Sequence, residues 1–290
     1  LTFENGPLSL DASIRHDSQR GSGTQKFGDG ANGGTWNPAK VNTINYTTNG
    51  TSYSMGGNYE LQKNLAMFGR ASHRESWKSP DRVVWDGAVD NGSAPYPVNK
   101  VDQFEAGAKY KGKGFSAFVT AFLAKTKEGA GYELTTQTVK ENSYDAKGVE
   151  AEASINLGNL RLAGGATLTD AKITSGANDG KTPRRQAKLI YQASPSYMMG
   201  GLEVGAHIIG TTDSYAQDDN MVKLPAFATV NAYANYELAR NTVVSVGINN
   251  LFDTLGYTEA EGQNNLSLNP LYIARAINGR SAKASLKYSF

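Results

Sequence analysis

The carboxyl-terminal segment constrains the fold of this chain more than any other stretch. From residue 282 to residue 290, apolar side chains occupy every second position and alternate with lysine and serine. Successive side chains of a β-strand point to opposite faces, so the segment predicts a strand with one apolar and one polar face. The strand ends on Tyr288 and Phe290, an arrangement typical of the closing strand of an outer-membrane β-barrel, where both rings lie at the lipid interface.

The composition is compatible with such a barrel and excludes several other classes of protein. The chain has 290 residues and a net charge of +2, so no strong field indicates a nucleic acid or an acidic partner. It has no cysteine, which excludes disulfide scaffolds and cysteine-ligated metal sites. No apolar run reaches the roughly 18 residues of a transmembrane helix, but a barrel strand needs only about 9–11 residues, half of them facing a polar lumen.

The same alternation recurs along the chain and predicts about twelve strands. They cover residues 8–14, 53–61, 65–74, 101–110, 115–125, 149–155, 160–169, 185–193, 201–209, 229–237, 242–250 and 282–290. Short turns, at residues 62–64, 111–114, 157–159, 194–196 and 239–241, alternate with long loops at residues 21–49, 77–100, 128–142, 175–183, 213–224 and 253–278. This parity predicts an all-β, antiparallel up-and-down transmembrane β-barrel with its short turns at one end, and not a sandwich with crossing connections.

Aromatic residues gather beside the predicted short turns, as expected for an interfacial girdle. They are Tyr59, Tyr110, Phe115, Tyr191, Tyr197, Tyr236, Tyr288 and Phe290. A general preference of aromatic residues for strands would not explain why they cluster at one end.

Alternation also predicts which side chains face lipid and which face the lumen. The predicted lipid-facing residues are Val149, Ala151, Ala153, Ile155, Val230, Ala232, Ala234, Ala282, Ala284 and Leu286. The predicted lumen-facing residues are Glu150, Glu152, Asn231, Asn235, Lys283 and Lys287. Reversing a strand would place charges in hydrocarbon at a cost of up to about 2–4 kcal/mol for a midplane lysine, so the register is strongly specified.

Other chemistries have weaker support in the sequence. His16, His73 and His207 lie in separate segments without a nucleophile partner, so we predict no enzyme, no catalytic residue and no cofactor. The acidic loop of Asp213, Asp218, Asp219 and Asn220 lacks the spacing of an EF-hand, and we predict no metal site.

Several motifs together resemble one family. They are Asn249-Asn250-Leu251-Phe252-Asp253, Tyr257, Gly279-Arg280 and Tyr288-Ser289-Phe290, with Pro225, Val230-Asn231-Ala232-Tyr233, the hairpin Ala239-Arg240-Asn241, Trp77-Lys78-Ser79-Pro80-Asp81, and Gly148-Val149-Glu150 at a strand start. This set is similar to that of the TonB-dependent outer-membrane receptors, most specifically from about residue 225 to residue 290. The resemblance implies localisation in the bacterial outer membrane, a barrel of about 22 strands with a plugged lumen, and active import of a scarce nutrient.

From the resemblance we expect residues 1–290 to be the carboxyl-terminal part of such a barrel, with the plug domain and first strands absent. Leu1 begins no signal peptide, which fits that expectation. The implied partners are outer-membrane lipid, TonB acting through the missing plug region, the barrel insertion machinery that would read Tyr288 and Phe290, and a small-molecule ligand, but no nucleic acid.

The resemblance also implies where a ligand would bind, in the extracellular loops and upper lumen. Candidate residues there are Trp36, Trp77, Arg82, Trp85, Tyr96, Arg184, Arg185 and Tyr215. Aromatic rings and arginines suit an anionic iron chelate or a stacked sugar. A ferric siderophore is the leading cargo, and the alternatives are a sugar, cobalamin, a small passive outer-membrane channel closed from these strands alone, or a soluble all-β binding protein.

Overall fold

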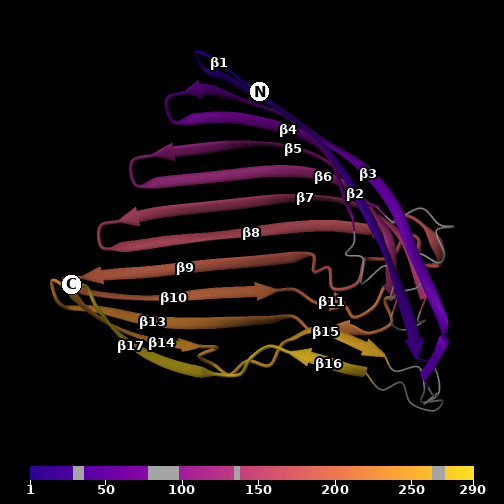
Figure 1. The fold of residues 1–290 in the computed structure, drawn as a ribbon. Helices are drawn as coiled ribbons and strands as arrows, with labels where there is room; N and C mark the ends of the chain where they lie inside the picture. The colour runs from indigo at the N-terminus through magenta and orange to yellow at the C-terminus, as the bar shows by residue number, and fades with distance from the viewer. Residues whose placement is uncertain (29–35, 78–97, 134–137, 263–271) are drawn as a thin grey trace.

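The computed structural model describes residues 1–28, 36–77, 98–133, 138–262 and 272–290, with the side chains of residues 25–44, 130–141 and 261–271 left undescribed. Within these ranges the chain forms one 13-stranded antiparallel sheet in which strands adjacent in sequence are nearly always neighbours (Figure 1). In order across the sheet the strands are β1 (Thr2–Asn5), β2 (Leu8–Gly28), β3 (Trp36–Gln62), β4 (Leu65–Trp77), β5 (Val98–Gly112), β6 (Phe115–Glu133), β7 (Thr138–Leu157), β8 (Leu160–Ile173), β9 (Leu189–Met199), β10 (Leu202–Thr211), β13 (Phe227–Ala239), β14 (Thr242–Asn249) and β17 (Ser281–Tyr288). The twelve predicted strands are therefore confirmed, and β1 is an additional one.

The connections sort by length as predicted. Tight turns join β3 to β4, β5 to β6, β7 to β8, β9 to β10 and β13 to β14. Figure 1 shows them at the same end of the sheet as the carboxyl terminus, with the longer connections at the opposite end. Gly114, Gly158 and Gly200 occupy these turns with positive φ, a conformation that costs glycine little. We call the other end, where the longer connections lie, the mouth end.

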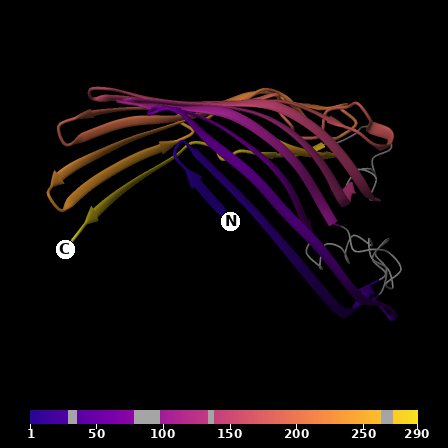
Figure 2. The same ribbon diagram turned by 90° about the horizontal axis from the view of Figure 1, so that it is seen from above.

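The sheet is strongly curved and open. Its order runs from β1 to β17, and these two edge strands are not paired with one another in the described residues. Figure 2 shows the arch from above, and Figure 1 shows β1 and β17 at opposite edges of the sheet. No helix in the part of the chain that the structure describes is long and apolar enough to cross a membrane.

Three predicted loops are wrong, because strand pairing extends through them. Residues 21–49 were expected to form a Gly/Asn-rich loop, but β2 and β3 pair as far as Gly28 and Trp36. Residues 128–142 likewise belong mostly to β6 and β7, which pair as far as Glu133 and Thr138. The predicted loop at residues 253–278 contains a separate hairpin, β15 (Tyr257–Gly262) and β16 (Tyr272–Ala276). At the mouth end the strands extend past the predicted membrane band, where no apolar face is required. Polar and glycine-rich sequence can therefore stay paired in these strand ends.

The predicted turn at residues 194–196 is also wrong. β9 begins at Leu189, not at residue 185, and continues through Pro195 to Met199, so the chain reverses at Gly200-Gly201. Proline has no N–H to donate, and the pairing of β9 with β10 is interrupted between Ser196 and Ala193, where the proline lies. Tyr191 consequently lies at the mouth end of β9 and does not belong beside a short turn.

The register divides the sheet into two faces, because partners on neighbouring antiparallel strands share a face. Starting from Glu150, the face of each residue can be assigned from its register partners on the neighbouring strands and from the alternation along each strand. This assignment extends without a break from β2 to β17. All six predicted lumen-facing residues fall on one face, which we call the polar face. All ten predicted lipid-facing residues fall on the other, the apolar face. The shared faces follow from the register, whereas their assignment to lumen and lipid stays a prediction.

Aromatic rings on the polar face pack over glycines of neighbouring strands. The ring of Phe122 lies where a Cβ on Gly148 would be, and the ring of Phe68 covers Gly107 in the same way. The glycine of the resembling Gly148-Val149-Glu150 motif therefore provides room for a ring, and it lies in the middle of β7, not at the strand start expected from sequence.

Candidate ligand-binding site

The polar face carries hydrogen-bonded charges that fix its geometry near β2–β4. Arg70 donates to both oxygens of Asp11, at 2.7 and 2.9 Å, and its other terminal nitrogen donates to Ser54 at 3.2 Å. Nη2 contacts both carboxylate oxygens while Nη1 donates to Ser54, so the guanidinium is held in one orientation between two neighbouring strands. These residues come from three adjacent strands, so the pair also fastens the strands in register.

A second polar cluster lies on the same face at β10, β13 and β14. Tyr233 donates to Glu203 at 2.9 Å, and its ring stacks on His207 with centroids 5.3 Å apart. Asn235 also donates to Glu203, at 3.4 Å. These side chains, with Lys283 of β17, line a cavity of about 450 Å³. The wall therefore offers hydrogen-bonding groups at several heights, as the lumen of a transporter requires.

The mouth end carries a small packed structure formed by three connections, which we call the cap. It comprises residues 174–188, the hairpin of β11 (Ser214–Tyr215) and β12 (Lys223–Leu224), and the hairpin of β15 and β16. Its core is made of Ala216, Leu224 and Ala260, with Tyr257 and Tyr272 packed against them. Apolar burial thus gives these loops a defined shape.

Buried and half-buried polar side chains tie the three parts of the cap together. Asn220 accepts a hydrogen bond from the Thr182 amide at 2.9 Å and donates to the Thr182 carbonyl at 2.7 Å. Asp218, 4% exposed, accepts from the Arg184 amide at 2.8 Å, and Gln217 donates to the Ala260 carbonyl at 2.8 Å. A buried polar group is costly unless it is paired, so these contacts specify one arrangement of the loops.

The cap brings together three of the predicted ligand-binding residues, Arg184, Arg185 and Tyr215. Arg185 has a φ of 62°, and its amide donates to the Tyr215 carbonyl at 2.7 Å. Its guanidinium lies 2.6 Å from Glu259, and Arg275 lies 2.9 Å from the other oxygen of the same carboxylate. Two guanidinium groups thus bind one carboxylate at the mouth, and the Arg275 side chain is 76% exposed.

The sequence did not identify Glu259 and Arg275 as part of this arrangement. Both lie in the stretch predicted to be a long loop, and their proximity depends on the pairing of β15 with β16. Alternation within residues 257–260, where Tyr257 and Glu259 are separated by one residue, was the available signal.

The other predicted ligand residues are placed differently. Trp77 lies at the end of β4. It is separated from His73 and Glu75 by an even number of residues, so its side chain lies on the same apolar face as theirs. Its indole N–H is buried and has no hydrogen-bond partner among the described residues. Trp36 begins β3, but its side chain is not described. Arg82, Trp85 and Tyr96 lie outside the residues that the structure describes.

The acidic loop residues considered for calcium have other partners. Asp213 binds Lys223 at 2.7 Å, and Asp219 accepts from the Met221 amide at 3.0 Å. The hydrogen bond from the Lys223 ammonium lowers the pKa of Asp213, and the same contact raises the pKa of Lys223. Among the residues that the structure describes, no three histidine, cysteine or acidic side chains are grouped to hold a metal ion.

The motif at residues 249–253 forms a tight, buried corner between β14 and the cap. Asn250 adopts φ 48°, and its side chain makes three hydrogen bonds. Its Nδ2 donates to the carbonyls of Thr254 and Asn278, and its Oδ1 accepts from the Thr254 amide. Asp253 accepts from the Arg280 amide at 2.7 Å. The motif thus joins the strand leaving the wall to the strand that returns as β17.

At the other end, Tyr288 and Phe290 place their rings edge to face, with centroids 5.4 Å apart. Both rings are mostly exposed, and beside the other short turns Tyr59, Tyr110 and Phe115 are between 37% and 48% exposed. An exposed aromatic row at this end of the sheet fits the interfacial girdle predicted from sequence.

Comparison with known proteins gives a consistent result. The family described as TonB dependent receptor-like, beta-barrel matches residues 1–251. The ferrichrome outer membrane transporter/phage receptor of Escherichia coli K12 is 29% identical over 197 residues, which are 63% of this chain and 26% of the transporter. The metal-pseudopaline receptor CntO of Pseudomonas aeruginosa is 25% identical over 220 residues, 69% of this chain and 29% of the receptor.

Solved structures share the fold at lower identity. The ferric yersiniabactin uptake receptor FyuA of Yersinia pestis superposes with a TM-score of 0.79 at 16% identity, covering 99% of this chain and 44% of that receptor. The copper transporter OprC gives a TM-score of 0.74 at 17% identity, covering 100% and 48%. The chain spans about a quarter of the curated relatives and less than half of these structures. With its antiparallel wall and long-loop mouth, the chain belongs to the TonB-dependent receptor family of outer-membrane β-barrel proteins.

Proposed function

We propose that this chain is the carboxyl-terminal wall of a receptor that actively imports a ferric siderophore across the outer membrane. In this proposal the plug domain and the first strands belong to the rest of the protein, and TonB delivers energy through that plug. The polar face lines the lumen, and the cap forms part of the ligand-binding mouth. Tyr288 and Phe290 act as the signal for the barrel insertion machinery.

The observation that carries the proposal is the pair of guanidiniums at the mouth. Arg185 and Arg275 share the carboxylate of Glu259, and Tyr215 adjoins them in the same cap. Arginine binds carboxylates and other planar anions through paired hydrogen bonds, and it is less strongly hydrated than lysine. The exposed guanidinium of Arg275 can bind an anionic iron chelate in this way, whereas a neutral sugar offers it no charge.

The relatives support an iron or metal chelate as the class of cargo. Ferrichrome, pseudopaline and yersiniabactin appear in the names of the matched proteins, and copper in one of them. The passive-channel alternative would require β1 or β2 to pair with β17, but these strands lie apart at the two sheet edges. Open edges are not tolerated in lipid, which favours further strands between them.

The experiment is a growth and uptake panel with the full-length gene. A deletion strain is supplied with single iron sources, including ferrichrome and catecholate, citrate and mixed-ligand chelates, and separately with copper, cobalamin and oligosaccharides. We expect one ferric chelate to support growth only when both the receptor gene and TonB are present. Normal growth of the deletion strain on every iron source, with a defect on copper, cobalamin or a sugar, would contradict the proposed cargo.

A matched pair of variants tests the site itself. Arg275→Ala removes one of the guanidiniums at the mouth and should lower the uptake of that chelate by roughly 10- to 150-fold, since a charged hydrogen bond contributes about 1.5–3 kcal/mol. Arg240→Ala removes an exposed arginine from a short turn at the opposite end and should leave uptake unchanged. Equal uptake by both variants would remove the cap from the binding site while leaving the transport function intact.

A further inference from the structure

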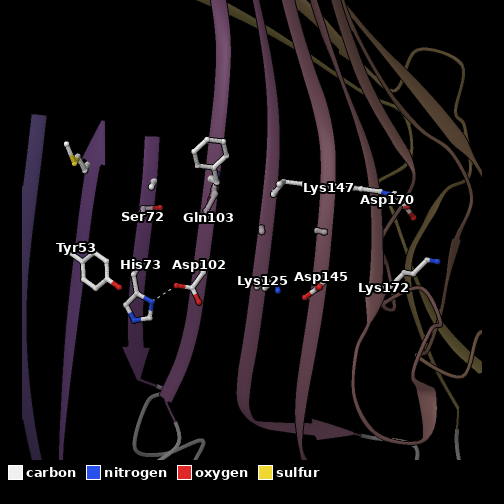
Figure 3. Close-up of a pocket in the computed structure, with 16 residues that line it drawn as sticks. Tyr53, Ser72, His73, Asp102, Gln103, Lys125, Asp145, Lys147, Asp170 and Lys172 are labelled. Carbon is white, nitrogen blue, oxygen red and sulfur yellow. Dashed lines mark hydrogen bonds and ion pairs between the residues drawn. The ribbon is translucent and has the colours of Figure 1, made fainter. Parts of the chain in front are cut away.

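Ion pairs are arranged differently on the wall and in the cap. On the apolar face of the wall, positive and negative charges alternate along one row of register partners on β5 to β8, which are Asp102, Lys125, Asp145 and Lys172 (Figure 3). In the cap, two guanidiniums instead meet at one carboxylate. Arg185 lies 2.6 Å from Oε2 of Glu259, and Arg275 lies 2.9 Å from Oε1 of the same side chain. The glutamate therefore binds two arginines at once.

The Glu259 carboxylate occupies the position that a planar anion from outside would take between the two arginines. Each of its oxygens is bound by a guanidinium from a different connection, and arginine binds the carboxylates of ligands in the same way. The Glu259 side chain is 17% exposed, whereas the Arg275 side chain is 76% exposed. An anion arriving from solvent can therefore reach Arg275 while Glu259 is still in place.

The backbone holds Arg185 in place without help from Glu259. Its φ is 62°, and its amide donates to the Tyr215 carbonyl at 2.7 Å. The left-handed region is unfavourable for arginine, whereas glycine adopts it at little cost. An arginine held in an unfavourable conformation indicates that its side chain is needed at this position.

The hairpin of β15 and β16 holds Arg275 in a similar way. Arg275 is the register partner of Glu259, and the neighbouring Ala260 is 3% exposed. The Ala260 carbonyl accepts a hydrogen bond from Gln217 at 2.8 Å, which ties the hairpin to the connection that contains β11 and β12. Backbone pairing and burial therefore position both arginines, and the ion pairs with Glu259 are not needed for this purpose.

We propose that Glu259 is a tethered competitor that determines the specificity of the mouth. In this inference, which rests on the proposed function, the anionic cargo displaces the Glu259 carboxylate and binds Arg185 and Arg275 in its place. A monocarboxylate offers the arginines no more than the tethered carboxylate does, whereas a chelate with several anionic oxygens contacts both guanidiniums and further parts of the mouth. Glu259 thus selects multiply charged anions.

The energetics allow such an exchange. Ion pairs at a solvent-accessible surface contribute little to stability because water screens them, so the displacement of Glu259 costs little. A carboxylate on a short tether nevertheless has an effective concentration on the order of millimolar. Dilute monocarboxylates therefore fail to displace it, whereas an anion with several contacts succeeds.

The test is a calorimetric titration of the full-length receptor in detergent with iron-free citrate, and with acetate as the monocarboxylate comparison. Glu259→Gln removes the charge of the competitor, and the control Glu237→Gln removes an exposed glutamate beside the short turn between β13 and β14. We expect Glu259→Gln to bind citrate about tenfold more tightly than the wild-type receptor, the factor for a site that the tether leaves open about one-tenth of the time. Glu237→Gln should bind citrate as the wild-type receptor does, and Glu259→Gln should bind acetate more weakly than citrate. Equal or weaker citrate binding by Glu259→Gln, or equal affinity of this variant for citrate and acetate, would overturn the proposal.

Two further variants keep the test decisive if Glu259→Gln disturbs the hairpin, which amide exchange in β15 and β16 would reveal. Glu259→Asp keeps the charge but shortens the tether, so it should also bind citrate more tightly than the wild-type receptor, and equal binding would contradict the proposal. Glu259→Gln/Arg275→Ala should lose the gain, whereas citrate binding as tight as that of Glu259→Gln would place the citrate elsewhere. The titration contains no iron, so it is decided separately from the uptake panel, whose failure would refute the proposed cargo alone.

Discussion

Replacing Asn250 tests how the motif at residues 249–253 holds the wall to the cap. The side chain is 4% exposed, and its three hydrogen bonds are 2.9 to 3.0 Å long. Two of them reach Thr254 and the third reaches Asn278, just before β17. Asn250→Ala would remove all three and leave two carbonyls and one amide without their partner.

The expected loss follows from these contacts and the backbone. Three hydrogen bonds at about 1 kcal/mol each give about 3 kcal/mol in the free energy of unfolding. The φ of 48° adds about 1 kcal/mol for alanine, because asparagine tolerates the left-handed region and alanine does not. Asn250→Gly loses the hydrogen bonds but keeps the conformation, so it should be about 1 kcal/mol less destabilised than Asn250→Ala.

The assay is urea unfolding of the full-length receptor in lipid vesicles, followed by heat-modifiable mobility on gels. The control is Asn249→Ala, whose side chain is exposed and makes one weaker contact, 3.3 Å to Ser281. That control should change stability by less than about 1 kcal/mol. If Asn250→Ala also unfolds within 1 kcal/mol of the wild-type receptor, the assignment of the motif as a structural corner is wrong.

Three further predictions use other parts of the chain. Gly148→Val would force a Cβ against the Leu168 carbonyl oxygen and the Phe122 ring and should destabilise the barrel by about 1–3 kcal/mol. Gly69→Ala, whose nearest neighbour is the Glu105 carbonyl at 3.6 Å, should cost less, and urea unfolding measures both. Phe290→Asp should lower the amount of receptor recovered in the outer membrane, and unchanged recovery on heat-modifiability gels would argue against an assembly signal. The lowered pKa of Asp213 and the raised pKa of Lys223 mean that their pair stabilises the cap at neutral pH. This contribution should be lost at low pH, as pH falls through the pKa of Asp213, which lies below its usual 3.8. It should also be lost at high pH, as pH rises through the pKa of Lys223, which lies above its usual 10.5. Amide exchange in β11–β12 measures both changes.

Alternation predicted the membrane-spanning parts of the strands well, because each such strand must present one apolar face to lipid. The segment from Val149 to Ile155 and the closing strand carry this pattern without interruption, and both lie in the sheet as expected. Toward the mouth end the requirement for an apolar face ends, so β2, β3, β6 and β7 continue in polar sequence that resembles loop. Their extension is decided by pairing between distant segments, which local periodicity does not report.

The errors at Pro195 and in the cap have related causes. A proline flanked by serines indicates a turn locally, but here Pro195 is left out only of the pairing with β10, remains opposite Leu162 of β8, and the strand continues. In the cap, Arg184, Arg185 and Tyr215 were chosen for their chemistry and the structure gathers them. Glu259 was missed because its contact with Arg185 joins residues from two connections far apart in sequence.

The central claim is that the polar face lines the lumen while the apolar face contacts lipid. Spin labels placed singly at Glu150 and Ala151, neighbours on β7 whose side chains point to opposite faces, test it most directly in the full-length receptor in bilayers. We expect the label at Ala151 to be accessible to oxygen dissolved in lipid, and the label at Glu150 to be shielded from it and accessible to a water-soluble nickel reagent unless the plug covers it. Lipid-type accessibility at Glu150 together with water-type accessibility at Ala151 would contradict the account.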